Sequence, residues 1–232
     1  MDAKNSIVTE QGYYVAQIKT ADLAIFSYYV ESNKEAILID PTLDTSLYKD
    51  IIAKRHSTLK YVLLSHYHAD YLSGHTQFNV PIVMGPHAKR EVNTFQIQEF
   101  KDGEEIALGH VKVRVVHTPG HTPESSCFLL VDGCQDQCIF TGDTVFLGDV
   151  GRPDLAVKSG ESNEDQAAVL FDSIQKIKAL DGNVRIYPGH GSGSSCGKAI
   201  GAGNFCNVEK QKANNYGFKF TDRAEFVKAV VA

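Results

Sequence analysis

The chain has 232 residues, enough for one large domain or for one domain with a small appendage. Hydrophobic residues make up 43% of the chain and charged residues 22%, so it can bury a sizeable core. The formal charge of -5 argues against a nucleic-acid partner, and no window has the apolar length that spans a bilayer. We therefore expect neither nucleic acid nor a membrane as a partner.

The N-terminus and the cysteines bear on the cellular compartment. Residues 1–5 contain neither the apolar core of a signal peptide nor the Arg- and Ser-rich pattern of a transit peptide. The five cysteines are an odd and scattered set, which favours free thiols in a reducing compartment over a disulfide framework. We expect a cytoplasmic protein, or a mitochondrial one if a transit peptide has been removed.

Strand and helix signals alternate along the first third of the chain. Segments rich in Tyr, Val, Ile and Phe predict strands at 12–19, 23–31 and 35–40. Apolar residues at helical spacing predict a helix over 46–56. The nearly all-apolar run at 60–65 predicts a strand that is buried on both faces.

The same alternation continues beyond residue 80. Further strands are expected at 81–84, 111–116, 126–131, 137–141 and 184–187. Further helices are expected at 86–92, 163–180 and 221–232, the last beginning with a Thr221 cap and Glu225. This mixture of hairpins and β-α units predicts a mixed sheet covered by helices, an α/β layered sandwich.

Metal-capable side chains follow directly after four of the predicted strands. Alternate residues at a strand end point the same way, so the two imidazoles of the SHYHAD segment can converge on one point. Imidazole and carboxylate together suit zinc, iron or manganese, and the lack of nearby thiols argues against a structural zinc knuckle. A metal site is therefore predicted, with the candidate residues His66, His68, Asp70, His121, Asp143 and His190.

The segments SHYHAD, HTPGHT, TGD and PGHG, in this order and spacing, resemble the metallo-β-lactamase superfamily. The resemblance covers about residues 12–205. It implies an αββα four-layer sandwich with the metal site at one edge of two packed sheets. We expect a catalytic domain at 1–205 and a C-terminal helical extension at 206–232, which resembles the start of a linker to a rhodanese domain.

One position departs from the pattern of most hydrolases in this superfamily. They carry a His directly after the Asp of HxHxD, and that His helps to hold a second metal, whereas this chain has Tyr71. A phenol has a reference pKa near ~10 and normally stays protonated and neutral. A two-zinc hydrolytic site would therefore lose a ligand here.

The segments HADYLSGH, GDVGRPDL and HGSGSSCGK are similar to the persulfide dioxygenases, particularly the bacterial members fused to rhodanese domains. This resemblance implies one Fe(II) per chain, with open positions for a persulfide and O₂. It implies oxidation of glutathione persulfide, or a related persulfide, to sulfite and a thiol. The implied iron ligands are His66, His121 and Asp143, and the implied catalytic residues near the iron are His68, Asp70, Tyr71 and His190.

The same resemblance places a substrate pocket beside two loops. Arg152 either pairs with a glutathione carboxylate or fixes its loop through Asp154. The Gly- and Ser-rich segment 191–198 is expected to hold the glycyl end of the substrate. Cys196 either carries a persulfide from a partner rhodanese or is an inert thiol. The predicted substrate-binding residues are Arg152, Ser194, Cys196 and Lys198.

Three functions remain open from the sequence. The leading one is a persulfide dioxygenase, acting on glutathione persulfide and O₂. The first alternative is a glyoxalase II-like hydroxyacylglutathione hydrolase with one or two metal ions, zinc among them. The second alternative is a non-catalytic sulfur-carrier or binding protein that has kept the fold. We also expect a homo-oligomer and a rhodanese sulfurtransferase as a partner.

Overall fold

Two β-sheets face each other in the computed structural model, which describes residues 6–10, 12–20, 24–89, 95–156 and 161–232. The first sheet contains, in spatial order, β1 (Ser6–Glu10), β2 (Tyr13–Thr20), β3 (Ile25–Ser32), β4 (Glu35–Ile39), β5 (Thr58–Leu63), β6 (Ile82–Met84) and β7 (Ile97–Glu99). The second contains β15 (Cys206–Asn207), β14 (Arg185–Pro188), β11 (Gln135–Gly142), β10 (Ser126–Asp132), β9 (Val111–His117) and β8 (Glu105–Leu108). A small third sheet pairs β12 (Val145–Phe146) with β13 (Asp149–Val150).

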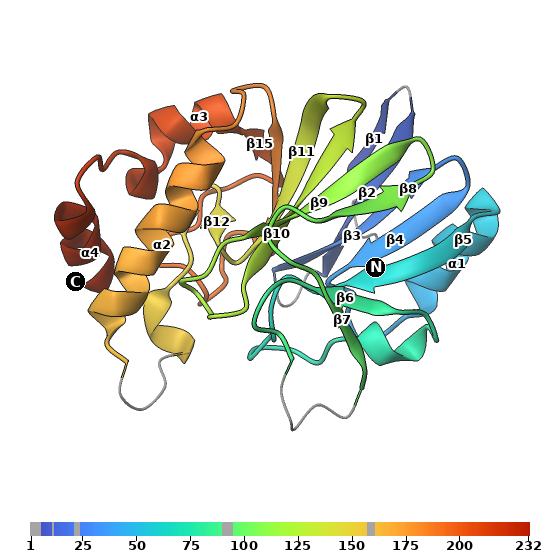
Figure 1. The fold of residues 1–232 in the computed structure, drawn as a ribbon, viewed down its shortest axis with the longest axis horizontal. Helices are drawn as coiled ribbons and strands as arrows, with labels where there is room; N and C mark the ends of the chain where they lie inside the picture. The colour runs from blue at the N-terminus through green and yellow to red at the C-terminus, as the bar shows by residue number, and fades with distance from the viewer. Residues whose placement is uncertain (1–5, 11, 21–23, 90–94, 157–160) are drawn as a thin grey trace.

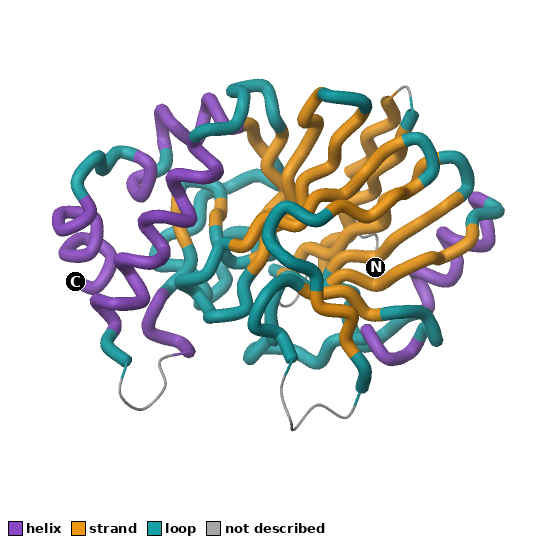
Figure 2. The backbone as a smooth tube through the Cα atoms, viewed as in Figure 1, coloured by secondary structure: helices purple, strands orange, loops and turns teal. Residues whose placement is uncertain are grey.

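Helices cover the outer face of each large sheet (Figures 1 and 2). Helix α1 (Ser46–Arg55) packs on the first sheet, where Tyr48 is buried among the apolar side chains of that face. The second sheet is covered by α2 (Asn163–Lys178), α3 (Val208–Asn214) and α4 (Arg223–Val231). Single turns of 3-10 helix lie at His75–Gln77, Pro153–Ala156 and Tyr216–Phe218. The αββα sandwich predicted from the sequence is confirmed.

The central core lies between the two sheets. Aromatic rings from both sheets meet there: the centroids of Tyr28 and Phe140 are 4.9 Å apart, and those of Phe140 and Tyr187 are 5.4 Å apart. All three side chains are at most 2% exposed. Burial of such rings supplies much of the apolar area that stabilises a domain, and ring pairs add about 0.5–1.5 kcal/mol each. Packing in this core therefore holds the two sheets together, and strands of both sheets end in candidate metal ligands.

Most predicted elements are present, with boundaries shifted by a few residues. The strand predicted at 60–65 is β5, but only its end is buried on both faces. Thr58 and Lys60, near the start of the strand, are exposed. Several strands were missed, since their two to five residues are too short to show a period.

Two sequence predictions are wrong in detail. The helix expected at 86–92 is a turn at Pro86 and His87, because His87 adopts a φ of +65°, which a right-handed helix does not allow. Residues 90–92 lie outside the described part. The last helix is capped by Asp222 rather than Thr221, and the Asp222 carboxylate accepts the N–H of Glu225 at 2.9 Å.

Segment 206–232 packs into the same core as the rest of the chain. It supplies β15 to the second sheet, and Val208, Phe218, Phe226 and Val230 join the apolar cluster under α2. The domain boundary at residue 205 stays a prediction. Within the described ranges, none of the helices combines the length and apolarity needed to cross a bilayer.

Truncation of Phe226 tests how tightly α4 is bound to the core. Its ring is fully buried, with its centroid 5.5 Å from that of Phe171. Phe226→Ala should lower the free energy of unfolding by about 3–5 kcal/mol, because it leaves a cavity under α2. Urea denaturation followed by circular dichroism measures this, with the half-buried Val227→Ala as a milder control. Unchanged stability would show that α4 is not part of the cooperative core.

Candidate metal centre

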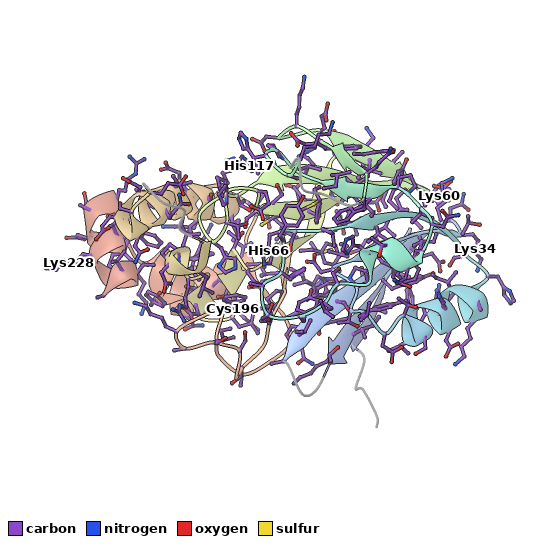
Figure 3. All side chains as sticks on the ribbon, turned by 90° about the horizontal axis from the view of Figure 1, so that it is seen from below. Lys34, Lys60, His66, His117, Cys196 and Lys228 are labelled. Atoms are coloured by element: carbon purple, nitrogen blue, oxygen red, sulfur yellow. The ribbon has the colours of Figure 1, made fainter. Side chains whose placement is uncertain are left out.

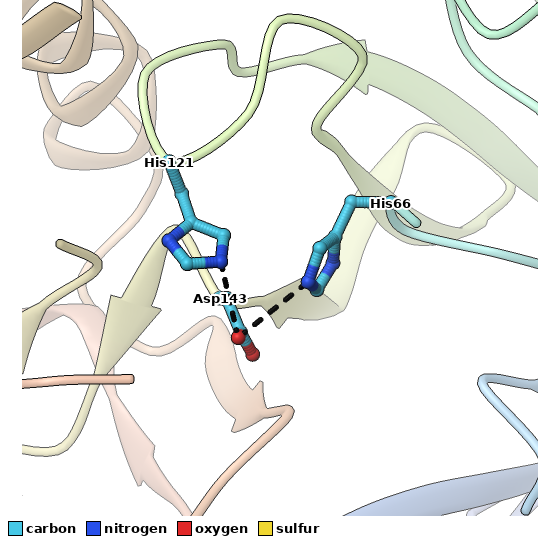
Figure 4. Close-up of side chains that lie close together, drawn as sticks. All are labelled: His66, His121 and Asp143. Atoms are coloured by element: carbon cyan, nitrogen blue, oxygen red, sulfur yellow. Dashed lines mark ion pairs between the residues drawn. The ribbon is translucent and has the colours of Figure 1, made fainter. Parts of the chain in front are cut away.

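Three side chains from three strand ends converge on one buried point (Figure 4). His66 follows β5, His121 lies in the loop after β9, and Asp143 follows β11. The Nε2 atom of His66 lies 3.5 Å from Asp143 Oδ2, and the Nε2 atom of His121 lies 3.4 Å from the same oxygen. All three residues are at most 4% exposed. The structure thus brings together the three predicted metal ligands.

Each of the two imidazoles is oriented through its other nitrogen. His121 Nδ1 donates to the carbonyl of Arg152 at 2.9 Å. His66 Nδ1 lies 2.9 Å from Ser65 Oγ, and that hydroxyl in turn donates to Asp40 Oδ2 at 2.7 Å. Because the serine proton is committed to Asp40, His66 Nδ1 is the donor. Both Nε2 atoms therefore face the shared point, as in metal sites whose ligands are oriented by outer hydrogen bonds.

Asp143 reaches this point because the chain bends sharply just before it. Gly142 has a φ of +50°, and a Cβ there would come within 2.6 Å of Ser65 Oγ. Glycine is therefore required at this position. The predicted Thr-Gly-Asp segment turns in this way off the end of β11 and carries the carboxylate under the two histidines.

One oxygen of Asp143 lacks a compensating partner among the described residues. Oδ1 accepts from His190 Nδ1 at 2.7 Å, whereas Oδ2 is buried and has no hydrogen-bond donor. Burial by itself would raise the pKa of Asp143, but His190 and His66 hold it well below its usual range. An ionised buried oxygen without a hydrogen-bond donor is costly, and a metal cation compensates it. Two histidines and one carboxylate fit iron or zinc.

The two candidate ligand histidines, His66 and His121, differ in the direction in which their pKa is shifted. Burial lowers the pKa of His121 to about 4, so its imidazole is neutral and ready to donate a lone pair. Burial also acts to lower the pKa of His66, but the charge and hydrogen bonding of Asp143 outweigh it and raise that pKa. A cation entering the site therefore has to displace a proton from His66.

His190 stands between two carboxylates. Its Nδ1 lies 2.7 Å from Asp143 Oδ1 and its Nε2 lies 2.7 Å from Asp70 Oδ2. Burial lowers its pKa, but the two carboxylates outweigh this and raise the pKa to about 10. The ring is thus an imidazolium that donates both protons and offers no lone pair in this arrangement. Its predicted position beside the metal ligands matches this geometry, and its catalytic role stays a prediction.

His68 and Tyr71 form a second arm of the site. His68 Nε2 lies 3.0 Å from Asp40 Oδ1 and 2.9 Å from the Tyr71 hydroxyl. Its Nδ1 atom is buried and has no hydrogen-bond partner among the described residues. Burial, together with the charges of Asp40, Asp143 and Asp70, raises the pKa of Tyr71 well above its usual range. The tyrosine is therefore a neutral phenol.

Sequence reasoning missed Asp40, which joins the two arms. Its carboxylate accepts from the backbone N–H of Ser65 at 2.9 Å, from the Ser65 hydroxyl and from His68. Burial acts to raise the pKa of Asp40, but His68 outweighs it and lowers that pKa, so the carboxylate is ionised. Like the other site residues, Asp40 lies at the end of a predicted strand, and that signal could have identified it.

The predicted substrate residues are held by contacts within the chain. Arg152 Nε and Nη2 bind Asp154 at 3.0 and 2.5 Å, which is the loop-fixing arrangement, and Nη1 donates to the carbonyl of Ser195. Lys198 Nζ contacts the carbonyls of Ala229 and Ala232. The Ser194 hydroxyl accepts from the N–H of Cys196 at 3.2 Å. Their roles toward substrate stay predictions.

All five cysteines are free, as predicted. Cys196 is the one that lies in the site, 5% exposed and near the middle of the molecule together with His66 (Figure 3).

Removal of the serine hydroxyl tests the hydrogen-bond chain behind His66. Ser65→Ala should weaken the affinity for Fe(II) about tenfold, because the His66 ring loses its link to Asp40. Competition with a chromophoric chelator measures this affinity. Ser57→Ala, which removes a hydroxyl beside Tyr29 on the first sheet, is the matched control. Equal affinity in both variants would mean that packing alone orients His66.

The charge state of His190 predicts how the metal-free protein responds to pH. Its pKa is raised from 6.5 to about 10, so the folded chain keeps a proton that the unfolded chain releases above pH 6.5. The free energy of unfolding should therefore fall as pH rises through this window. Urea denaturation at several pH values measures the slope, and His190→Gln should flatten it. Identical slopes for both proteins would contradict the assignment.

Comparison with known proteins shows the family to which the chain belongs. A model of the metallo-beta-lactamase superfamily matches residues 20–190. The hydroxyacylglutathione hydrolase of Francisella tularensis subsp. novicida (strain U112) is 34% identical over 170 residues, which cover 71% of this chain and 62% of that protein. The probable polyketide biosynthesis zinc-dependent hydrolase BaeB of Bacillus velezensis is 32% identical over 230 residues, 93% of this chain and 92% of that protein.

Solved structures show the same fold. A metallo-beta-lactamase from Staphylococcus aureus subsp. aureus COL superposes with a TM-score of 0.86 and 32% identity, over 95% of this chain and 67% of that one. ETHE1 from Myxococcus xanthus gives a TM-score of 0.76 at 24% identity, over 94% of this chain and 89% of that one, which shows the fold alone. The family model spans most of the chain, and the full-length match to BaeB exceeds 30% identity. The chain belongs to the metallo-β-lactamase superfamily.

Proposed function

We propose that the protein is a persulfide dioxygenase, which oxidises glutathione persulfide or a related small persulfide to sulfite and a thiol with O₂ at one iron. The observation that carries this proposal is Tyr71. It occupies the position where most hydrolases of the superfamily carry a His, and its buried phenol is neutral and bonded to His68. A neutral phenol is a poor metal ligand, so the site favours a mononuclear centre on His66, His121 and Asp143.

This three-residue face suits a reaction between two bound molecules. Fe(II) on two histidines and one carboxylate would supply adjacent open positions for a persulfide sulfur and O₂. The residues of the chain fix the orientation of the face: Arg152 holds His121, and Ser65 with Asp40 holds His66. Such fixed geometry is the chain's contribution to bringing the reactants together.

The Asp143–His190–Asp70 row offers a path for protons. His190 is 1% exposed, whereas the Asp70 side chain at the outer end is 30% exposed. A proton leaving the centre at Asp143 Oδ1 can pass to solvent through the two imidazole nitrogens and the Asp70 carboxylate. On the other side, the Tyr71 hydroxyl and His68 supply a second donor pair. We assign the catalytic roles of all four residues on this basis.

The substrate's glutathione part is proposed to bind beside the Arg152 loop. A cavity there is lined by Arg152, Ser195, Gly197 and Lys198. The Arg152–Asp154 pair is about one-third exposed, and such pairs contribute only about 0–1 kcal/mol, so a ligand carboxylate can replace Asp154 on the guanidinium. Arg152, Ser194, Cys196 and Lys198 remain the proposed substrate-binding residues.

A second candidate function is thioester hydrolysis of the glyoxalase II type. It is favoured by the 34% identity to the hydroxyacylglutathione hydrolase of Francisella tularensis subsp. novicida. The chain spans only 62% of the length of that relative. Thioester hydrolysis is therefore a candidate function for this chain.

Parallel assays on one preparation separate the two functions. The protein is loaded with Fe(II) without air, its metal content is measured, and O₂ uptake and sulfite release are followed with glutathione persulfide. A glutathione thioester is offered in a second assay. We expect one iron per chain, sulfite release and no thioester cleavage above background. His121→Ala, which lacks a ligand, should lose both the iron and the activity. Bound iron without sulfite release would contradict the dioxygenase proposal. Thioester cleavage with two bound metal ions per chain would support the hydrolase instead.

Tyr71→Phe tests the hydroxyl without disturbing the proposed ligands. The variant loses the contact with His68, so sulfite release should slow about tenfold while the iron content stays at the wild-type level. Tyr61→Phe, a change at the edge of the central core, is the control. A wild-type rate in the Tyr71→Phe variant would remove Tyr71 from the catalytic residues.

A further inference from the structure

A buried acidic side chain joins the two sheets beside the candidate metal ligands. Glu124 lies three residues after His121 and is 1% exposed. Its Oε1 atom accepts the backbone N–H of Tyr67, the residue after His66, at 3.1 Å. We propose that Glu124 is a positioning residue, which acts through the Tyr67 backbone to set the separation between His66 and His121. The proposal goes beyond the proposed function, because it holds whichever reaction the metal centre performs.

This separation matters because the candidate ligands belong to different sheets. His66 follows β5 of the first sheet, whereas His121 and Asp143 follow strands of the second (Figure 4). A small slide of one sheet against the other would change the distance from His66 to the other two side chains. A contact that ties the sheets together at this edge therefore fixes the distance before a metal binds.

The ligand atoms already have the spacing that a bound cation needs. The Nε2 atoms of His66 and His121 lie 3.5 and 3.4 Å from Asp143 Oδ2. With metal–ligand bonds of about 2.0–2.1 Å and tetrahedral angles, neighbouring ligand atoms are about 3.3–3.4 Å apart. The three side chains therefore need little adjustment on binding, and a contact that maintains their spacing contributes to the metal affinity.

The loop that carries Glu124 is closed by its own hydrogen bonds. The N–H of Thr118 donates to the carbonyl of Ser125 at 3.0 Å, and the N–H of Ser125 donates to the carbonyl of Thr122 at 3.3 Å. The hydroxyls of Thr122 and Ser125 lie 2.6 Å apart. Glu124 is thus presented from a fixed base, and its hydrogen bond to Tyr67 carries that position to the neighbouring sheet.

His66 is held on both sides by the same segment, residues 124–126. The carbonyl of Ser65, directly before His66, accepts the N–H of Ser126 at 2.9 Å. The N–H of Tyr67, directly after His66, donates to Glu124. The first of these bonds joins two backbones, whereas the second uses a side chain. The contact of Glu124 is therefore the one that a substitution can remove.

Two substitutions separate the position of the carboxyl group from its charge. Glu124→Gln keeps the length of the side chain and an oxygen that accepts the Tyr67 N–H, but it has no charge. Glu124→Asp keeps a carboxyl group but is one methylene shorter, so its oxygens are withdrawn from that N–H. Positioning and charge therefore predict opposite results for this pair of variants.

Titration of the metal-free protein with Co(II) in the absence of air measures both affinity and ligand geometry through the visible absorption of the ion. For the first equivalent, Glu124→Gln should keep the wild-type affinity and spectrum. Glu124→Asp should bind at least about tenfold more weakly, with shifted visible bands. Glu31→Asp is the matched control, because it shortens a buried glutamate that pairs with Arg55, and it should keep the wild-type affinity.

Wild-type affinity in Glu124→Asp, or a weaker affinity in Glu124→Gln, overturns the proposal. Glu124→Met covers the case in which Glu124→Asp does not fold, since it fills the same space without an acceptor oxygen. The same tenfold loss is expected there, and its absence is equally decisive. Hydrogen exchange of the Tyr67 amide should be faster in the Asp and Met variants than in the Gln variant. Since no substrate is present, failure of the persulfide assay does not affect these readouts.

Discussion

The buried, ionised carboxylate of Asp143 is the constraint on which the rest of the site depends. Such a charge costs several kcal/mol in an interior unless each oxygen is compensated. His190 compensates Oδ1 through a 2.7 Å contact, whereas Oδ2 has only the Nε2 atoms of His66 and His121 at 3.4–3.5 Å. The chain thus presents a negative charge beside two imidazole nitrogens, an arrangement that a cation completes. This incomplete compensation is the reason why the site favours a bound cation.

The register of two parallel strands holds this arrangement in place. β4 and β5 pair so that Ile39 lies beside Leu63, and just beyond this pair Asp40 and Ser65 come within hydrogen-bond distance. Asp40 then orients both histidines of the SHYHAD segment, His66 through the serine hydroxyl and His68 directly. A buried charge at the end of one strand therefore serves as the anchor for ligands on its neighbour.

His190 divides the site into two chemically different halves. On one side its Nδ1 supports the oxygen that faces the nitrogen-rich centre, and on the other its Nε2 binds Asp70 beside the Cys196 thiol. Tyr71 lies near both halves as a neutral phenol bonded to His68. The imidazole of His190 thus connects the candidate metal ligands with the Asp70 and Cys196 side chains.

The sequence by itself determined the layered α/β architecture and the set of strand ends that carry metal-capable residues. Both rest on local periods, and the spacing of His66, Asp70 and their partners is a property of the chain order. It also indicated Tyr71 as the departure that matters. The short strands could not be predicted from the sequence, because two to five residues show no period. The turn at His87 could not be predicted either, because a positive φ at a histidine has no sequence signal.

Only the tertiary structure decided how the site residues share their hydrogen bonds. Asp40 and Ser65 are 25 residues apart, and Asp70 and Cys196 are 126 apart, so their contacts depend on strand register and loop path. The same holds for His190, whose two carboxylate partners lie in different loops. Local propensity acts within a few residues along the chain, whereas these pairings arise from sheet packing, which brings distant strand ends to one edge.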